Sequence, residues 1–301
     1  HILPSKDKHN YFKGNLHGHS NHSDGALNPQ EVINKYKEIG YDFTCLSDHL
    51  WKGSKFAAET ILETKNLNQI DFITIPSAEL HCLGKKYIRD GLWHIVANGL
   101  PLDFKCADEK ETAPRLVQRA IEAGAFVTIA HPEWYSLTFD ECLSLSHAHG
   151  IEIYNHSCHI EAQRGFGTAA ADYLLQENKR IFLTATDDSH FKMQDAGAGW
   201  VMVAADKLSE SSILNALKNG QYYSSTGVEI FEFEINNYQV NIQCSPSNQV
   251  CVVGQGAKSM SQNGKNITKA EFDLKKYPSE WFRVSIANDS GDFAWTNPVW
   301  L

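Results

Sequence analysis

The chain has 301 residues, which is enough for one large domain or for a large domain joined to a small one. Its 36 acidic residues outnumber the 27 basic ones, and a surface of this charge is a poor binder of long nucleic acid. No apolar run approaches the roughly 20 residues that cross a bilayer. We therefore expect neither a nucleic-acid-binding nor a membrane-spanning protein.

The cysteines and the first residues bear on the cellular compartment. The seven cysteines are dispersed and form no CxxC pair, a pattern typical of reduced thiols. The first ten residues are polar and lack the apolar core of a signal peptide. These features favour a cytoplasmic protein. The chain begins at His1 rather than at a methionine, so the removal of an export signal is left open.

Short apolar runs typical of strands alternate with helical patterns over the first two thirds of the chain. Strands are expected at 43–46, 71–76, 94–98, 125–130, 150–154, 181–185 and 199–203, and helices at 29–39, 113–123 and 139–147. Asn28 followed by Pro29 is typical of a capped helix start. About seven strand–helix units of this kind predict an α/β fold whose parallel sheet closes into a (β/α) barrel.

The pattern changes after Gly220. Alternating polar and apolar residues, as in 230–235 and 281–287, are separated by turn-forming clusters and predict antiparallel strands. We therefore divide the chain into a barrel over residues 1–225 and a small C-terminal β domain over residues 226–301. The aromatic residues of this appendage are expected to form its core. It could shape substrate access or mediate self-association.

Residues of metal-ligand type follow several of the expected strands. Residues i and i+2 of an extended segment point to the same face, so His17 and His19 could bind one ion. Barrel folds carry their active sites at the ends of their strands, and burying ionisable groups without partners is costly. A repeated placement of such groups therefore indicates a metal site. The residues of this type are His17, His19, Asp24, Asp48, His49, Glu79, His94, His131, Asp187, Asp188 and His190.

The order and spacing of these motifs resemble the polymerase and histidinol phosphatase (PHP) superfamily of metal-dependent phosphoesterases. The resemblance covers roughly residues 11–204 and implies a distorted (β/α)7 TIM-like barrel with a trinuclear site. It implies one ion held by His17, His19, Glu79 and Asp188. It implies that Glu79 bridges to a second ion, which is also held by His94 and His131. The third ion would be held by Asp24, His49 and His190.

Three positions near these motifs have alternative interpretations. His81 could be the ligand in place of His94, although His94 opens an apolar strand as the family pattern does. The D-x-H register of the family selects Asp188 over Asp187, which leaves Asp187 as a supporting residue or strand cap. Asp48 is expected to orient an imidazole rather than to bind an ion itself.

The charge and donor types of the site indicate its chemistry. Three divalent ions outweigh three carboxylates, so the site is positive and suits a phosphate anion. Imidazole mixed with carboxylate suits zinc, manganese or iron, and we expect two to three such ions. A bridging hydroxide derived from metal-bound water would attack phosphorus in line with the leaving group.

A poor leaving group would also need a proton donor. The stretch after the strand at 150–154 offers His156 and His159, and Arg164 could clamp a phosphate through its two-pronged guanidinium. The alternative interpretation is an ordinary surface loop that happens to contain these residues. His22 and Lys52 are further candidates for the rim of the site, with weaker support.

The sequence therefore predicts a hydrolase that cleaves phosphate mono- or diesters of small metabolites or nucleotides. The expected partner is a small phosphorylated substrate, with no long nucleic acid and no membrane. One alternative is a metal-dependent amidohydrolase acting on C–N bonds, because barrels that open with an HxH motif also perform that chemistry. A second alternative is a non-catalytic binding module that retains the fold.

Overall fold

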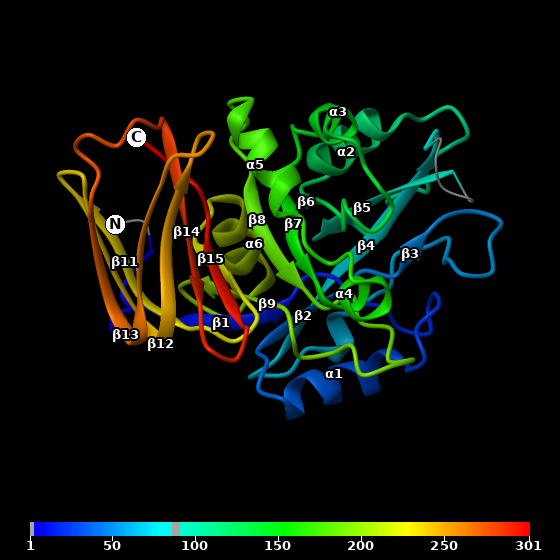
Figure 1. Cartoon of the computed structure of the whole chain (residues 1–301). Helices are drawn as coiled ribbons and strands as arrows, with labels where there is room; N and C mark the ends of the chain where they lie inside the picture. Colours follow the sequence, from blue (N-terminus) through cyan, green and yellow to red (C-terminus); the bar gives the residue numbers. More distant parts are fainter. Residues whose placement is uncertain (1–2, 86–90) are drawn as a thin grey trace.

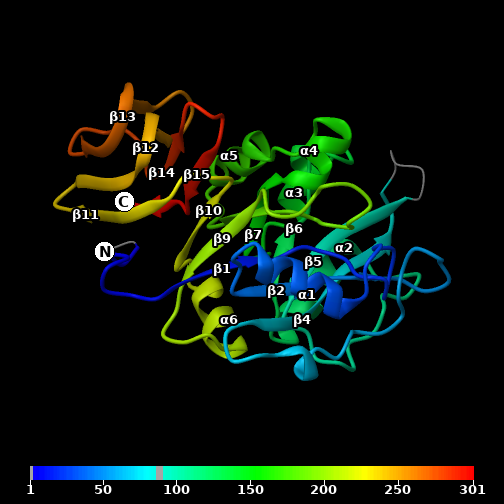
Figure 2. The ribbon, with the colours of Figure 1, turned by 90° about the horizontal axis from the view of Figure 1, so that it is seen from below.

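The computed structural model describes residues 3–85 and 91–301, in which the strands form one large mixed sheet with helices against it (Figures 1 and 2). The strands up to the chain's middle are β1 (Tyr11–Asn15), β2 (Phe43–Leu46), β3 (His49–Leu50), β4 (Ile73–Leu83), β5 (Leu92–Asn98), β6 (Phe126–Ile129), β7 (Gly150–Asn155) and β8 (Phe182–Thr186). The later strands are β9 (Trp200–Ala204), β10 (Tyr222–Ser225), β11 (Ile230–Asn236), β12 (Gln239–Gly254), β13 (Ser259–Asp273), β14 (Trp281–Ala287), β15 (Phe293–Thr296) and β16 (Val299–Trp300).

The N-terminal part of the sheet is mostly but not wholly parallel. β1, β2 and β4 pair in parallel, and so do β6, β7 and β8. Between these groups, β5 runs antiparallel to both β4 and β6. The strands expected here are all present, but the reversed direction of β5 departs from a uniform (β/α) repeat. The reversal follows from the length of the connection, because the eight residues from 84 to 91 are too few for the crossover that a parallel pair requires.

The sheet does not close on itself, so the closed barrel expected from the sequence is not formed. The segments that follow β1 and β8 meet at an isolated bridge between Gly18 and Ser189. The remaining edge of β1 is taken by β9, which pairs with it in the antiparallel sense and leads on to β10. The sheet therefore continues from β1 toward the C-terminal strands instead of closing on β8.

Side chains satisfy part of the backbone of β8 in place of a neighbouring strand. The Ser224 hydroxyl accepts from the Ala185 amide at 3.1 Å and donates to the Leu183 carbonyl at 3.0 Å. The Leu183 amide donates to Asn297 Oδ1 at 2.8 Å. These bonds satisfy the buried backbone groups of Leu183 and Ala185 on the side of β8 that has no strand ladder.

The helices are short and pack on the N-terminal part of the sheet (Figure 1). Asn28 caps the first helix through a reciprocal bond pattern with Glu31, which confirms the expected helix start. Amphipathic spacing places Val32, Ile33 and Tyr36 in the core. The helices are α1 (Pro29–Glu38), α2 (Ala113–Glu122), α3 (Phe139–Ser144), α4 (His156–Ala162), α5 (Thr168–Gln176) and α6 (Glu210–Lys218), with a 3-10 turn η1 at Lys65–Leu67. No helix among the described residues is both long and apolar enough to cross a membrane.

The C-terminal strands pair in the antiparallel sense, as the alternating pattern predicted. Phe233, Phe282 and Val284 are fully buried in a core of their own, so these aromatic and aliphatic residues do form the interior. The appendage is also continuous with the rest of the sheet, because β15 pairs with β10. The division at residue 226 into two domains stays a prediction.

An ion pair fastens the appendage to the helical layer. Arg283 on β14 is 3% exposed and makes two bonds to Asp172 on α5, Nε to Oδ1 at 2.7 Å and Nη2 to Oδ2 at 2.8 Å. Two parallel bonds between a guanidinium and a carboxylate are among the stronger polar contacts in proteins. The pair therefore joins two elements that lie 111 residues apart in the sequence.

We predict that Asp172→Ala lowers the free energy of unfolding by about 3 kcal/mol, because it leaves the buried Arg283 charge without its partner. Urea denaturation followed by far-UV circular dichroism measures the change. Asp289→Ala, which removes an exposed carboxylate from a turn, is the control and should stay within about 0.5 kcal/mol of the parent. Equal stability of the two variants would contradict the structural role given to this pair.

Candidate metal centre

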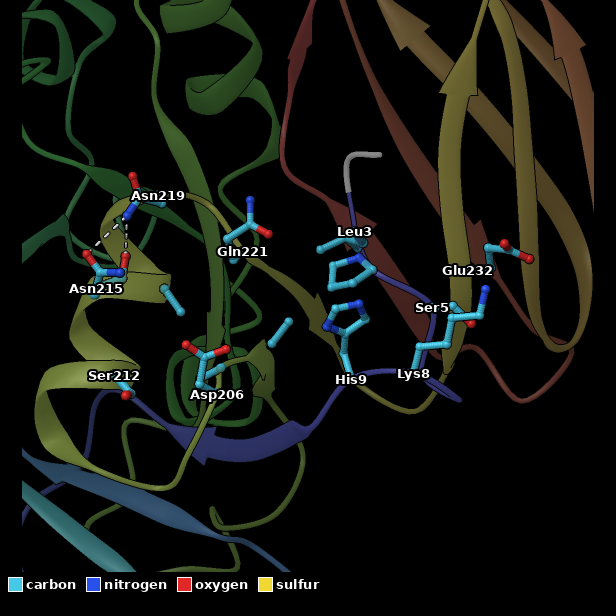
Figure 3. Close-up of a pocket in the computed structure, with 14 residues that line it drawn as sticks. Leu3, Ser5, Lys8, His9, Asp206, Ser212, Asn215, Asn219, Gln221 and Glu232 are labelled. Carbon is cyan, nitrogen blue, oxygen red and sulfur yellow. Dashed lines mark hydrogen bonds between the residues drawn. The ribbon is translucent and has the colours of Figure 1, made fainter.

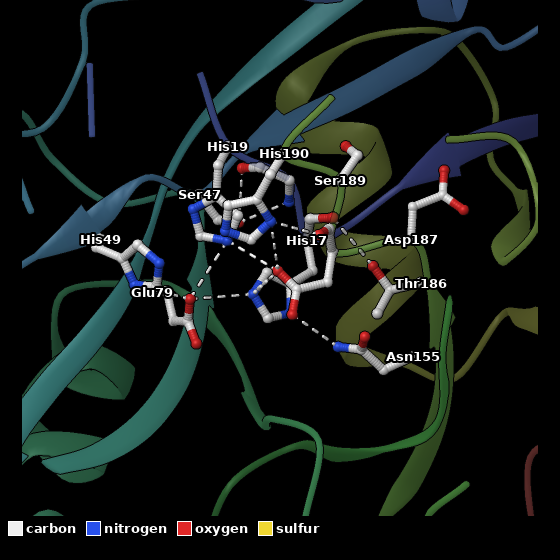
Figure 4. Close-up of polar contacts among 12 residues, drawn as sticks. His17, His19, Ser47, His49, Glu79, Asn155, Thr186, Asp187, Ser189 and His190 are labelled. Atoms are coloured by element: carbon white, nitrogen blue, oxygen red, sulfur yellow. Dashed lines mark hydrogen bonds and ion pairs between the residues drawn. The ribbon is translucent and has the colours of Figure 1, made fainter. Parts of the chain in front are cut away.

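The predicted ligands lie together at one end of the sheet, although they come from many separate segments. His17 and His19 follow β1, His49 begins β3, and Glu79 lies within the long strand β4. His131 follows β6, while Asp188 and His190 follow β8. His94 stands near the start of β5 and reaches the same end because β5 runs antiparallel to its neighbours. Figure 4 shows several of these side chains converging.

The first cluster comprises His17, His19, Glu79 and Asp188, all buried. Glu79 Oε2 lies 3.3 Å from His17 Nε2 and 3.3 Å from His19 Nε2. Asp188 Oδ1 lies 3.1 Å and 2.9 Å from the same two nitrogens. Two ligands of one tetrahedral ion with bonds near 2.05 Å are about 3.3 Å apart. The two distances to Glu79 therefore match a shared ion, whereas the shorter contact of His19 with Asp188 also fits a direct hydrogen bond.

The second cluster uses the other oxygen of the same carboxylate. Glu79 Oε1 lies 2.9 Å from His94 Nδ1 and 3.2 Å from His131 Nε2. Glu79 Oε2 also lies 3.0 Å from His49 Nδ1, so the two oxygens of Glu79 face different sets of imidazoles, which is the arrangement required of a bridging ligand. This agrees with the bridging role that the PHP resemblance implies for Glu79.

The third cluster lies toward the entrance and comprises His19, Asp24, His49 and His190. Asp24 Oδ1 lies 3.4 Å from His49 Nε2 and 3.4 Å from His190 Nε2. His190 Nδ1 bonds to the Asp188 carbonyl at 2.9 Å, which turns its other nitrogen toward Asp24. Since a carbonyl only accepts, Nδ1 carries the proton and Nε2 keeps its lone pair for an ion.

Several ligand atoms are buried without a hydrogen-bond partner. They include His17 Nε2, His19 Nδ1, Asp24 Oδ1 and Glu79 Oε2. An unsatisfied buried polar atom is costly, and native proteins rarely keep so many in one place. Divalent ions would supply partners for such atoms. The donor set, nitrogen and carboxylate oxygen, fits zinc, manganese or iron.

The electrostatics favour the ligand-competent state at two of the cluster residues, Glu79 and His19. Burial opposes ionisation of Glu79, but His49 and His17 overcome this and hold the pKa of Glu79 well below its usual range. Burial together with His190 and His49 lowers the pKa of His19 to about 4, so this imidazole is neutral near pH 7. An ionised carboxylate and a neutral imidazole are the forms that bind metal. Burial opposes protonation at four other histidines, but nearby carboxylates outweigh it and raise their pKa, so a bound ion would displace a proton from each of them: His17, His49, His131 and His190.

Sequence reasoning missed Glu152, a buried carboxylate in β7. Its Oε1 lies 2.9 Å from His17 Nδ1, so it fixes the imidazole with Nε2 toward Glu79 and Asp188. Asn155 also donates to Glu152, at 3.2 Å. The available signal was a single charged residue within an otherwise apolar strand.

Asp187 and Asp188 point in different directions and have separate environments. Asp188 lies in the cluster and has a φ of 53°, a left-handed conformation that is uncommon for a residue other than glycine and typical of functional sites. Asp187 instead accepts bonds from the amides of Gly197, Ala198 and Gly199 at 2.7–2.9 Å. It therefore holds the loop that follows His190, in agreement with the supporting role expected for it.

Asp48 does not orient an imidazole as expected. Its carboxylate accepts from the Ser20 amide and hydroxyl, both at 2.7 Å, and from the Ser23 hydroxyl at 2.6 Å. Asp48 thus shapes the turn that presents Asp24. The reason is geometric, because consecutive residues in an extended segment point to opposite sides and only His49 faces the cluster.

A cavity of about 360 Å³ opens over the clusters. Besides cluster residues, its lining includes Phe56, Trp134, Ser157, Cys158, Glu161, Asp195, Lys192 and Met193. Sequence reasoning placed the stretch that contains Ser157 and Cys158 at the rim of the site, but it missed the other residues. Lys192 had a usable signal, since it stands two residues after His190, and Trp134 likewise follows His131 closely.

The residues predicted as proton donors or phosphate clamps are placed differently. Among the described residues that line this cavity, His156, His159 and Arg164 do not appear. His156 Nδ1 forms a hydrogen bond of 2.8 Å with the Tyr154 hydroxyl, and Arg164 is exposed. The helix α4 does border the cavity, but through Ser157, Cys158 and Glu161.

The two weaker rim candidates also lie outside the described lining. His22 bonds to the Thr60 carbonyl at 2.8 Å, and Lys52 is exposed. A separate cavity of about 500 Å³ lies between the N-terminal segment, α6 and β11 (Figure 3). It is lined by residues such as His9, Asp206 and Gln221 and shares no lining residue with the metal cluster.

Comparison with solved structures places the whole chain beside one protein of similar organisation. A two-domain protein from Bacteroides vulgatus containing a predicted PHP-like metal-dependent phosphoesterase is 17% identical, with a TM-score of 0.54. The match covers 98% of this chain and 97% of that one. The two proteins share a fold, and the resemblance to PHP phosphoesterases is confirmed at that level.

Two other solved structures match more distantly. A candidate metal-dependent phosphoesterase from Bifidobacterium adolescentis is 13% identical, with a TM-score of 0.43 over 61% of this chain and 90% of that one. An amidohydrolase from Chromobacterium violaceum is 15% identical, with a TM-score of 0.39 over 61% and 89%. No protein-family model and no curated protein sequence matches the chain.

We predict that the variants Glu79→Gln and Asp24→Asn lose different numbers of ions. Glu79 joins two clusters, so its loss should release ions from both, whereas loss of Asp24 should affect only the third. Elemental analysis after dialysis against metal-free buffer measures the ions that remain per chain. Glu161→Gln, which changes a lining carboxylate outside the clusters, should retain the parental content. An unchanged content in Glu79→Gln would refute the bridging arrangement.

Proposed function

We propose that this chain is a metal-dependent hydrolase that cleaves phosphate esters of small molecules at a centre of two to three divalent ions. The observation that carries the proposal is the set of three contiguous ligand clusters joined through His19 and Glu79. A structural zinc site usually has a single closed set of four ligands, whereas contiguous clusters beside an open cavity suit catalysis.

The residues of the three clusters would hold the ions as described above. Bound divalent ions polarise phosphoryl oxygens, acidify water and neutralise charge in an in-line displacement. Three ions carry more positive charge than Asp24, Glu79 and Asp188 carry negative charge, so the loaded centre would attract an anion within an acidic protein. This charge balance supports a phosphate ester over an uncharged amide.

The cavity supports a small substrate. Its volume of about 360 Å³ matches pockets that bind metabolite-sized ligands. Trp134 and Phe56 offer aromatic surface beside the ligands, and Lys192 is the one cationic side chain among the described residues of the lining other than histidine. We propose that Lys192 contacts the anionic substrate and that the two aromatic rings pack against its organic part.

The roles of proton donor and phosphate clamp that were predicted for His156, His159 and Arg164 stay predictions, because α4 presents other residues to the cavity. Ser157 and Glu161 lie on the side of α4 that lines the cavity and can exchange hydrogen bonds with a bound ester. We propose that α4 takes part in substrate binding through these residues.

Hydrolysis of a panel of phosphomonoesters and phosphodiesters in the presence of Mn²⁺ or Zn²⁺ tests the proposed activity. We expect phosphate or alcohol release by the parent and a loss of about 10²–10⁴-fold in Glu79→Gln, since the metals supply several kcal/mol of transition-state stabilisation. His149→Asn, far from the clusters and able to keep the bond from the Val127 amide, is the control. Turnover of amides with none of esters would overturn the proposal in favour of an amidohydrolase.

We predict that Lys192→Met raises the KM for phosphate esters about tenfold or more, with a smaller effect on kcat, because it removes a charged contact to the bound anion. Steady-state kinetics on the best ester of the panel measures both constants. Lys207→Met removes an exposed lysine outside the cavity and should leave them unchanged. A fall in kcat at constant KM would instead assign Lys192 to the chemical step.

A further inference from the structure

His81 is a fully buried histidine beside the metal centre that none of the three clusters described above requires. It stands two residues after Glu79 on β4, so both side chains point to the same face. In the antiparallel pairing of β4 with β5 it lies opposite His94. Its contacts explain what it does there.

The hydrogen bonds of His81 determine which of its nitrogens carries the proton. His81 Nδ1 lies 2.9 Å from the Trp93 carbonyl oxygen, which can only accept. Nδ1 is therefore protonated, and Nε2 of the neutral ring is an acceptor. That acceptor lies 2.7 Å from His49 Nδ1. His49 must then donate from Nδ1.

The length of this contact distinguishes a hydrogen bond from a shared ion. Two ligand atoms on one tetrahedral ion lie about 3.3 Å apart, whereas 2.7 Å between two ring nitrogens is a hydrogen-bond distance. The grouping of His81 with His49 and Glu79 as a possible ion site is therefore the less suitable interpretation. With its proton on Nδ1, His49 keeps the lone pair of Nε2, which faces Asp24 Oδ1 at 3.4 Å.

We propose that His81 is a positioning residue that holds His49 in the tautomer and orientation needed to bind an ion in the cluster with Asp24 and His190. The relay runs from the Trp93 carbonyl through His81 to His49. The inference rests on the metal centre of the proposed function. The sequence offered His94 and His81 as alternative ligands of the same ion. The inference gives them different roles, because His94 contacts Glu79 directly whereas His81 acts through His49.

The same device recurs at two other imidazoles of the centre, which supports this assignment. The outer nitrogen of His17 is held by Glu152, and that of His190 is held by the Asp188 carbonyl. His49 has Glu79 Oε2 at 3.0 Å and His81 Nε2 at 2.7 Å on its Nδ1 side. If Glu79 is engaged by ions on both oxygens, His81 is the acceptor that remains for His49.

Two variants of His81 with a matched control test the inference. His81→Ala removes the acceptor, while the amide oxygen of His81→Gln can occupy the place of Nε2. We expect His81→Ala to weaken the binding of one Zn²⁺ ion by about 10–100-fold and to leave the other ions in place, with affinity largely retained in His81→Gln. Competition with a chromophoric chelator gives the affinities, and elemental analysis gives the count. His149→Ala, another histidine with a buried ring contact, should bind as the parent does.

Nuclear magnetic resonance of the parent protein labelled with ¹⁵N-histidine gives a second readout that needs no variant to fold. We expect the Nδ1–H tautomer at both His81 and His49, and in the ¹¹³Cd-loaded protein a coupling to His49 Nε2 with none to His81. Unchanged affinity in His81→Ala, or coupling of ¹¹³Cd to His81, would overturn the inference. Since these measurements use no substrate, absence of ester hydrolysis would refute the proposed function without affecting them.

Discussion

The candidate metal centre depends on one buried carboxylate, that of Glu79. Glu79 is 1% exposed, and an ionised carboxylate at such depth costs several kcal/mol unless other groups compensate for it. β4 continues beyond the end of β2, so Glu79 lies where β3 and β5 are its neighbours and where turns after other strands converge. The imidazole nitrogens within 2.9–3.3 Å of its oxygens belong to His17, His19, His49, His94 and His131. The positions of all these side chains are coupled through this one residue.

This concentration of polar groups is a feature of function rather than of stability. Several ligand atoms have no hydrogen-bond partner in the protein, and Asp188 has a strained backbone conformation. The surrounding apolar core supports the arrangement through rigid strands, and groups outside the clusters fix the orientation of the imidazoles. Glu152, the Asp188 carbonyl and His81 each contact the outer nitrogen of one ring. The clusters are therefore preorganised for ions by contacts that can be read individually.

Much of this site could be predicted from the sequence, because the HxH spacing and the positions after strands follow from the periodicity of extended chains. The nine predicted ligands lie together, while their binding of ions stays a prediction. The antiparallel direction of β5 could not be predicted, since strand direction depends on pairing partners that no local pattern specifies. The open sheet was missed for the same reason, because β9 occupies the free edge of β1. The orientation of α4 was missed because its short sequence has no periodicity strong enough to show which face is buried.

The continuity of the sheet has a consequence for dissecting the molecule. β10 pairs with β15 on one side, and the amide of Leu183 on β8 is satisfied by Asn297 from the C-terminal part. A chain cut at residue 225 would keep every candidate metal ligand yet present the edge of β10 to solvent. Unprotected strand edges recruit strands from other molecules, so such a fragment would be prone to aggregate. The C-terminal strands therefore protect this edge, and the part that carries the candidate metal ligands is best produced together with them as one polypeptide.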